Sequence, residues 1–129
     1  MSIFRVQVEL APLDESRWES VLAVVDTGST LTKIPRALAE RLGLSTLGQR
    51  RFRLSDERVV ERDVAAAAIR LEGRKGVVVV ALAGNEEEPI LGVTALEGLG
   101  FAADPVGEVL IASDYHEYAE SEAARVAAQ

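Results

Sequence analysis

The chain has 129 residues, a length typical of one domain, and its 48% of hydrophobic residues can fill a core. It has no cysteine and a single histidine, which excludes disulfides and thiolate metal sites and argues against a Ser-His-Asp triad. The formal charge of −7 argues against a nucleic-acid-binding protein, because such a protein needs a basic face.

The N-terminal segment shows no pattern of export or membrane insertion. Residues 1–10 alternate apolar and polar side chains and lack the continuous apolar stretch of a signal peptide. No segment approaches the ~18 consecutive apolar residues that span a bilayer. We therefore expect a cytoplasmic protein with no membrane partner.

Strand patterns dominate the first part of the chain. Residues 3–10 alternate and predict a half-buried strand. Residues 18–25 predict a second strand, which ends apolar on both faces ("LAVV") as a strand does when it enters an interior. After "DTGS", residues 31–34 predict a short strand. The segment "PRALAERLGL" then predicts a helix that starts at Pro35 and is capped by Gly43.

Hairpins are predicted for the middle of the chain. The segment "RRFRLSDERVVERDV" predicts a long hairpin with its tip near Ser55, Asp56 and Glu57. The alanines of the following "AAAAIRL" favour a helix by propensity. We predict a strand there instead, because "EGRKG" and the β-branched run "VVVVAL" after it complete another hairpin.

The last part of the chain alternates loops with short elements. "AGNEEEP" predicts a solvated loop, whose three glutamates do not converge on a metal ion. "PILG" predicts a short strand, "VTALEGLGF" a short helix with Thr94 and Glu97 spaced as a capping box, and "GEVLI" a last strand. These elements predict one mainly β domain over residues 1–111, with a closed or folded-over sheet and two short helices. Residues 112–129 form an acidic, alanine-rich tail, either helical or disordered.

The segment "LAVVDTGSTLTKIP" places Asp26 at the end of an apolar strand. Asp-Thr-Gly is common in turns, because aspartate accepts backbone N–H groups and glycine tolerates positive φ. A chemical role is favoured by the apolar strand, since burying a carboxylate is costly unless hydrogen bonds or a shared proton relieve it. Thr27 and Ser29 supply hydroxyl groups, and Gly28 offers an unobstructed N–H.

A second segment, "EPILGVTALEGLGF", supports the chemical role. Its apolar pair and Gly92 would let another backbone pack closely beside the aspartate turn. Together, "VVDTGST", "ILG" and the short helix resemble the retropepsin-like aspartic proteases, and most of all their small bacterial members. The resemblance covers residues 3–111.

This resemblance implies a homodimeric acid protease fold with a closed, barrel-like sheet, acting on peptides without a metal or cofactor. Two carboxylates share a proton, one activating a water and the other protonating the substrate. Because the chain has no second Asp-Thr-Gly or Asp-Ser-Gly, Asp26 of a second copy would supply the other carboxylate. Because the two carboxylates titrate as a coupled pair and must hold one proton between them, activity would be favoured at acidic to neutral pH.

The resemblance also implies roles for individual residues. Asp26 is the catalytic carboxylate, and Thr27 hydrogen-bonds across the dimer. Gly28 contacts the carboxylate or the substrate backbone, and Ser29 hydrogen-bonds the outer carboxylate oxygen. Gly92 belongs to a packing element beneath the site and is structural.

The hairpin over residues 51–62 matches the flap that closes over a peptide bound as an added strand. Its tip lacks the glycines of retroviral flaps. The candidate substrate contacts at this tip are Leu54, Ser55, Asp56, Glu57 and Arg58.

Five arginines crowd the hairpin. They either steer acidic substrates or grip a peptide backbone, or they belong to a solvated hairpin whose charged edges resist aggregation, and the last explanation is favoured. They are Arg50, Arg51, Arg53, Arg58 and Arg62.

Three functions follow from these observations. The first is a homodimeric aspartic endopeptidase whose extended peptide substrates carry apolar residues at the cut, a preference implied by the resemblance. The second is a peptide-binding or scaffolding module on the same dimeric fold that cleaves weakly or not at all. The third is an unrelated β protein in which Asp26 only shapes a turn, and this one predicts a monomer.

Overall fold

The computed structural model describes residues 3–117 and 119. Within them the chain forms, in order, β1 (Arg5–Ala11), β2 (Glu19–Val25), β3 (Thr32–Pro35), α1 (Arg36–Leu42), β4 (Ser45–Arg53), β5 (Val59–Leu71), β6 (Arg74–Ala83), β7 (Ile90–Leu91), α2 (Val93–Leu99), β8 (Phe101–Asp104) and β9 (Val109–Ala112). The mainly β prediction is confirmed. Neither α1 nor α2, the helices of this described part, is long and apolar enough to cross a membrane.

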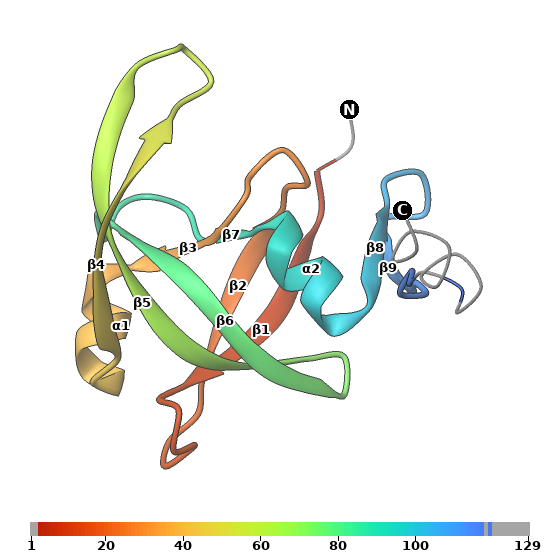
Figure 1. The fold of residues 1–129 in the computed structure, drawn as a ribbon, viewed down its shortest axis with the longest axis horizontal. Coiled ribbons are helices and arrows are strands. Elements are labelled where there is room, and N and C mark those ends of the chain that lie inside the picture. Colours follow the sequence, from red (N-terminus) through yellow and green to blue (C-terminus); the bar gives the residue numbers. More distant parts are fainter. Residues whose placement is uncertain (1–2, 118, 120–129) are drawn as a thin grey trace, which may run out of the picture.

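Seven of the strands form a sheet that closes on itself (Figure 1). Their order is β1-β2-β7-β3-β6-β5-β4, and β1 also pairs with β5. The second pairing closes six strands into a barrel and leaves β4 outside it, attached to β5. The predicted closed sheet is confirmed, and closure leaves the outer edge of β4 as the free edge of this sheet within the described part of the chain.

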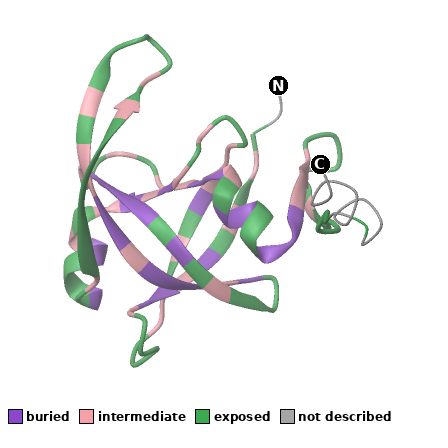
Figure 2. Cartoon of the chain, viewed as in Figure 1, coloured by how far each residue is buried: buried purple, intermediate pink, exposed green. Residues whose placement is uncertain are grey.

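Aliphatic side chains form the core, and the buried residues lie along the strands of the barrel and on the helices (Figure 2). Val8, Leu10 and Ile69 are at most 1% exposed, and Phe101 is the one buried aromatic residue among those described. The alanine run of β5 is a strand, as predicted, because β6 pairs along one side of it and β4 and β1 pair along the other. Pairing on both sides overrides the helix propensity of alanine.

The two helices follow the predictions only in part. α1 starts one residue after Pro35 and ends at Gly43, whose φ of 64° is the left-handed conformation that glycine favours. The capping box predicted for α2 is wrong, since Gly92 precedes the helix and no side chain caps it. The Thr94 hydroxyl instead donates to the Thr30 carbonyl oxygen at 2.6 Å and ties the helix to the loop after β2.

Strand β8 departs from the prediction, which placed Phe101 at the end of the helix segment and no strand between it and "GEVLI". β8 pairs with β9 in a separate two-stranded sheet. The pairing with β9, rather than any pattern in "FAAD", makes this segment a strand. Most of the predicted tail lies outside the described residues; of the described part, Ala112 ends β9 and residues 113–117 form neither helix nor strand.

The hairpin of β4 and β5 projects beyond the barrel (Figure 1). The loop between β2 and β3, which carries Asp26, lies at the same end of the molecule. None of residues 51–60 at the projecting end is buried. The fold thus brings the aspartate loop and the predicted flap to one end of the barrel.

Candidate active site

Asp26 lies in a tight turn beside β7. Its N–H donates to the Leu91 carbonyl oxygen at 3.1 Å, and the Ser29 N–H donates to the Asp26 carbonyl oxygen at 3.1 Å. β7 lies between β2 and β3, parallel to the first and antiparallel to the second. The two strands that flank the aspartate turn are therefore held apart and fixed by a later segment of the chain.

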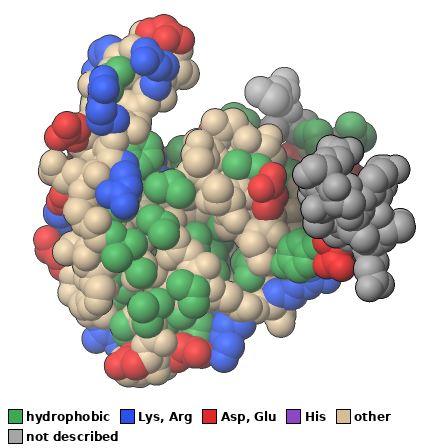
Figure 3. Space-filling view, in the orientation of Figure 1, with side chains coloured by type: hydrophobic (Ala, Val, Ile, Leu, Met, Phe, Trp, Pro, Cys, Tyr) green, Lys and Arg blue, Asp and Glu red, His purple; other side chains and the backbone are tan. Residues whose placement is uncertain are grey.

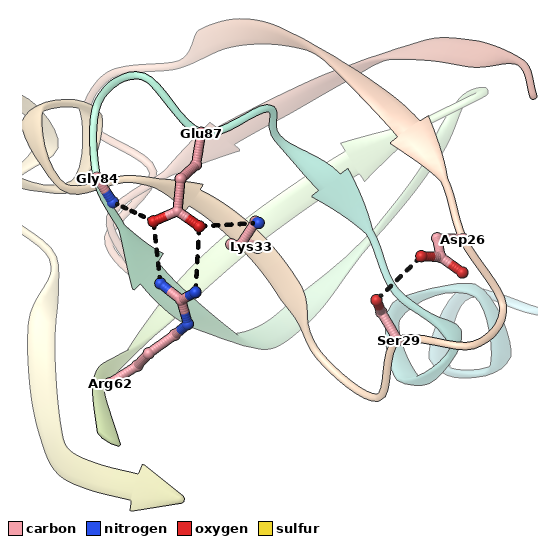
Figure 4. A network of polar contacts seen from close by, with 6 residues as sticks. All are labelled: Asp26, Ser29, Lys33, Arg62, Gly84 and Glu87. Carbon is pink, nitrogen blue, oxygen red and sulfur yellow. Dashed lines mark hydrogen bonds and ion pairs between the residues drawn. The ribbon is translucent and has the colours of Figure 1, made fainter. Parts of the chain in front are cut away.

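Two neighbours orient the Asp26 carboxylate. The Gly28 N–H donates to Oδ1 at 2.9 Å. The Ser29 hydroxyl donates to Oδ2 at 3.3 Å, as Figure 4 shows. A Cβ on Gly28 would lie 3.2 Å from Oδ1, closer than most Cβ contacts. The turn itself thus holds the carboxylate by one donor on each oxygen.

The segment around Gly92 packs against the backbone of the aspartate loop. A Cβ on Gly92 would lie 2.5 Å from both the carbonyl carbon and oxygen of Leu31, so only glycine fits there. The Gly92 N–H donates to the hydroxyl of Thr32, a residue only 2% exposed, at 3.1 Å. The Val93 N–H donates to the Ser29 carbonyl oxygen at 2.8 Å. The close approach predicted from "ILG" is present.

The strand before Asp26 is less buried than its sequence predicted. Leu22 is 50% exposed and Val24 and Val25 are partly exposed, while Ala23 is buried. The prediction of a strand buried on both faces is therefore wrong for the single chain, because nothing in the described part covers its second face. Thr27 and Gly28 at the tip of the turn are also exposed.

A groove of about 1010 Å³ separates the aspartate loop from the projecting hairpin. Asp26, Gly28 and Ser29 form part of one wall, and residues 50–55 form much of the other. Apolar and cationic side chains of the barrel complete the lining, namely Lys33, Arg62, Val79, Ala81 and Ile90. A carboxylate held in place within such a groove can activate a water toward a bound chain.

The predicted flap residues divide into two groups. Leu54 and Ser55 line the groove, while Asp56, Glu57 and Arg58 form the outer tip. The Leu54 N–H donates to the Arg58 carbonyl oxygen at 2.8 Å, and the Glu57 N–H donates to the Leu54 carbonyl oxygen at 2.9 Å. Glu57 adopts a φ of 72°, the position at which such a three-residue hairpin loop favours glycine. The tip thus forms a regular hairpin turn without glycine.

Near the groove lies an ion cluster that sequence reasoning missed (Figure 4). Arg62 donates to the two carboxylate oxygens of Glu87 at 3.2 and 3.1 Å, and Lys33 donates to one of them at 3.2 Å. The Gly84 N–H donates to Glu87 at 2.9 Å. The hydrogen bonds from Arg62, and then those from Gly84 and Lys33, lower the pKa of Glu87 to about 2.

This cluster corrects two predictions. Glu87 is not part of a merely solvated loop, and the Arg62 side chain is only 16% exposed rather than solvated. No local pattern reveals the pairing, because Arg62 and Glu87 lie on different elements. Among the described residues, no three His, Asp or Glu side chains are grouped as a metal site requires.

The sequence matches a model of the aspartyl protease family over residues 15–95, and the chain belongs to this family. The match spans the aspartate turn, the hairpin and the Gly92 segment. A comparison with curated proteins gives no match.

Solved structures with the same fold are retroviral and retroviral-like proteases. The EIAV protease in complex with an inhibitor is 21% identical, with a TM-score of 0.55 over 74% of this chain and 86% of that one. The retroviral protease-like domain of Ddi1 from Leishmania major is 16% identical, with a TM-score of 0.51 over 87% and 90% of the two chains. A retropepsin-like aspartic protease from Rickettsia conorii is 20% identical, with a TM-score of 0.49 over 84% and 88%. The fold is retropepsin-like.

Proposed function

We propose that the protein is an aspartic endopeptidase that acts as a homodimer, with one Asp26 from each copy at the catalytic centre. The observation that carries this proposal is the Asp26 carboxylate, held by Gly28 and Ser29 in the wall of a groove of about 1010 Å³. Membership in the aspartyl protease family supports the same chemistry.

In the proposed reaction, one Asp26 carboxylate takes a proton from a water as the water oxygen bonds to the peptide carbonyl carbon. The partner's Asp26, which is protonated, gives its proton to the carbonyl oxygen. The first Asp26 then gives the proton that it took from the water to the amide nitrogen as the C–N bond breaks. A hydroxyl of the tetrahedral intermediate returns a proton to the partner's Asp26, so a carboxyl group forms and the pair regains its starting state. Gly28 and Ser29 hold the carboxylate, and Thr27 hydrogen-bonds between the two copies.

The dimer is proposed because one chain supplies only half of the site. Asp26 belongs to the one Asp-Thr-Gly of the sequence, and no Asp-Ser-Gly is present. The exposure of Thr27, Gly28 and Leu22 supports the proposal, since a second copy at this end would cover them.

We also propose the following organisation. Residues 1–111 form the protease domain and residues 112–129 an appended acidic tail, in a cytoplasmic protein that needs no cofactor. The partners would be a second copy and a peptide, and neither nucleic acid nor a membrane. The peptide would lie along β4, whose outer edge has no strand partner among the described elements.

The test is cleavage of an unbiased peptide mixture across roughly pH 4 to 7, with wild type beside Asp26→Asn, read by mass spectrometry. We expect cuts by the wild type and none by the variant, which keeps the shape of the side chain but cannot act as a base. Analytical ultracentrifugation of both proteins is the control for folding and assembly. Equal cleavage by the two proteins would contradict the role of Asp26.

The second candidate is a peptide-binding module that cleaves weakly or not at all. The glycine-free tip favours it, because Glu57 fixes a turn that glycine would leave mobile. Peptide capture by a folded dimer that makes no cuts would support this candidate over the enzyme.

A further inference from the structure

The groove is strongly cationic although the protein is acidic. Its lining contains five cations, namely Lys33, Arg50, Arg51, Arg53 and Arg62, and one carboxylate, that of Asp26. The chain as a whole carries a formal charge of −7. Lys and Arg side chains also gather over the projecting hairpin in the space-filling view (Figure 3). A concentration of positive charge in one groove of a negative protein favours an anionic ligand there.

These cations differ in whether they already have a carboxylate partner. Glu87 pairs with both Lys33 and Arg62, and Arg53 pairs with Glu57 at 3.4 Å. In contrast, no described carboxylate pairs with Arg50 or Arg51. Arg51 lies opposite Glu61 on the other face of β4, whereas Arg50 lies on the face of Arg62, and its side chain donates only to the Gln49 carbonyl oxygen. A ligand carboxylate can therefore bind Arg50 without breaking an ion pair inside the protein.

The position of Arg50 makes the binding of a negatively charged group beside it more favourable. In the β4–β5 register it lies directly opposite Arg62, so the two guanidinium groups occur on one face of the hairpin. Like charges that face each other across strands are destabilising. Glu87 offsets part of this charge but is shared with Lys33, so three cations face a single carboxylate.

The remaining lining indicates what else the ligand carries. Leu31, Phe52, Val79 and Ile90 are apolar and lie in the same groove. Apolar walls combined with an unpaired arginine fit a peptide that has both apolar and acidic side chains. The overall negative charge of the protein disfavours a long nucleic-acid polyanion.

We propose that the groove selects peptides with aspartate or glutamate near the apolar residues at the cleaved bond, and that Arg50 is the residue that selects them. The cleavage in this inference rests on the proposed function, and the selection does not. The selection of acidic peptides is a binding property that can be measured separately.

The test uses one complex peptide mixture in two measurements, at about pH 6, where peptide carboxylates are ionised. In the first, Asp26→Asn protein captures peptides without cutting them, at about 50 and 500 mM salt. In the second, protein with Asp26 intact cleaves the same mixture. Both are repeated with Arg50→Gln. The matched control is Arg17→Gln, an exposed arginine outside the groove whose partner Glu19 keeps its pair with Arg41.

We expect captured peptides to be enriched in acidic residues at low salt, with the enrichment lost at high salt. Arg50→Gln should lower the enrichment about threefold, in the range of a partly exposed ion pair, and Arg17→Gln should leave it unchanged. The fraction of cuts that lie near acidic residues should likewise fall in Arg50→Gln and stay unchanged in Arg17→Gln.

Three outcomes of the capture measurement would overturn the inference: captured peptides without acidic enrichment, equal enrichment in Arg50→Gln, or no capture by a folded protein. Cuts that show no acidic preference would leave the protease proposal intact and remove this one. Acid-selective capture without any cuts would support the selection of acidic peptides and count against the protease proposal.

Discussion

At the scale of a single residue, a substitution of Gly92 tests the packing beneath the aspartate turn. In Gly92→Ala the new methyl group would lie 2.5 Å from the Leu31 backbone, which cannot move without disturbing β3. We expect a loss of about 2 to 4 kcal/mol in the free energy of unfolding, measured by urea denaturation. Activity should fall as well, because the same displacement moves the aspartate loop.

Gly98→Ala is the matched control, since Gly98 lies in α2 and a Cβ there meets nothing within 4 Å. Its φ is not positive, so alanine should raise the stability by about 0.5 to 1 kcal/mol through helix propensity. A similar loss in both variants would show that Gly92 has no special packing role.

Glu87 predicts a dependence of stability on pH. Its pKa is lowered from 4.5 to about 2 in the folded protein, so its ion pairs stabilise the fold fully above pH 4.5. This contribution is lost as the pH falls from 4.5 toward 2. Glu87→Gln should cost about 1 to 2 kcal/mol at pH 7, since a third of the side chain is exposed and solvent screens the pair.

Urea denaturation of both proteins at a series of pH values checks this expectation. The difference between wild type and Glu87→Gln should shrink on acidification and nearly vanish at about pH 2. Glu86→Gln, a change at the exposed neighbouring residue, serves as the control. A difference that stays constant with pH would contradict the ion-pair explanation.

At the scale of elements, we expect glycine substitutions at two positions of the hairpin tip to change the stability in opposite directions. Glu57 has a positive φ, which costs a non-glycine residue about 1 to 2 kcal/mol. Glu57→Gly should therefore keep the stability or raise it by up to about 1 kcal/mol, because the relief of strain outweighs the entropy of the unfolded glycine. Denaturation with urea measures the change.

Ser55→Gly is the comparison, because Ser55 lies in the same tip and has no positive φ. Here glycine brings only the entropic cost, and we expect a loss of about 0.5 kcal/mol. Equal effects at the two positions would show that the tip does not adopt the turn described.

Most elements could be predicted from local patterns, and the exceptions have physical reasons. The alternation of apolar and polar residues predicted β1, and the turn residues predicted the hairpin of β4 and β5. The capping box failed because Thr94 hydrogen-bonds to Thr30 on a distant loop. β8 was missed because only its pairing with β9 makes it a strand.

The candidate site was predictable to the extent that it is local. The Asp26 turn and the close packing of Gly92 follow from residue types and spacing. The cluster of Lys33, Arg62 and Glu87 was missed, because it joins β3, β5 and the loop between β6 and β7. Such contacts depend on the tertiary structure and leave no periodic signal in the sequence.

At the scale of the whole molecule, the proposed dimer predicts the behaviour of mixed chains. If each site needs Asp26 from two copies, a dimer of wild type and Asp26→Asn is inactive. After subunit exchange, an equal amount of the variant should reduce the activity of a fixed amount of wild type to about half, and a ninefold excess to about one tenth.

Peptide cleavage after mixing measures this effect, and the same additions of Arg17→Gln chain are the control, since that variant keeps Asp26. An activity that does not change with added Asp26→Asn would show that each chain works alone.

The insertion of β7 between β2 and β3 also bears on how the protein is made. During synthesis, Asp26 leaves the ribosome long before Leu91 and Gly92, which hold its turn in place. A nascent chain therefore carries the aspartate without its support, and the turn becomes rigid only when nearly the whole barrel has been translated. The proposed proteolytic centre, if built in this order, would be inactive on the ribosome, where unfolded neighbouring chains would be its easiest targets.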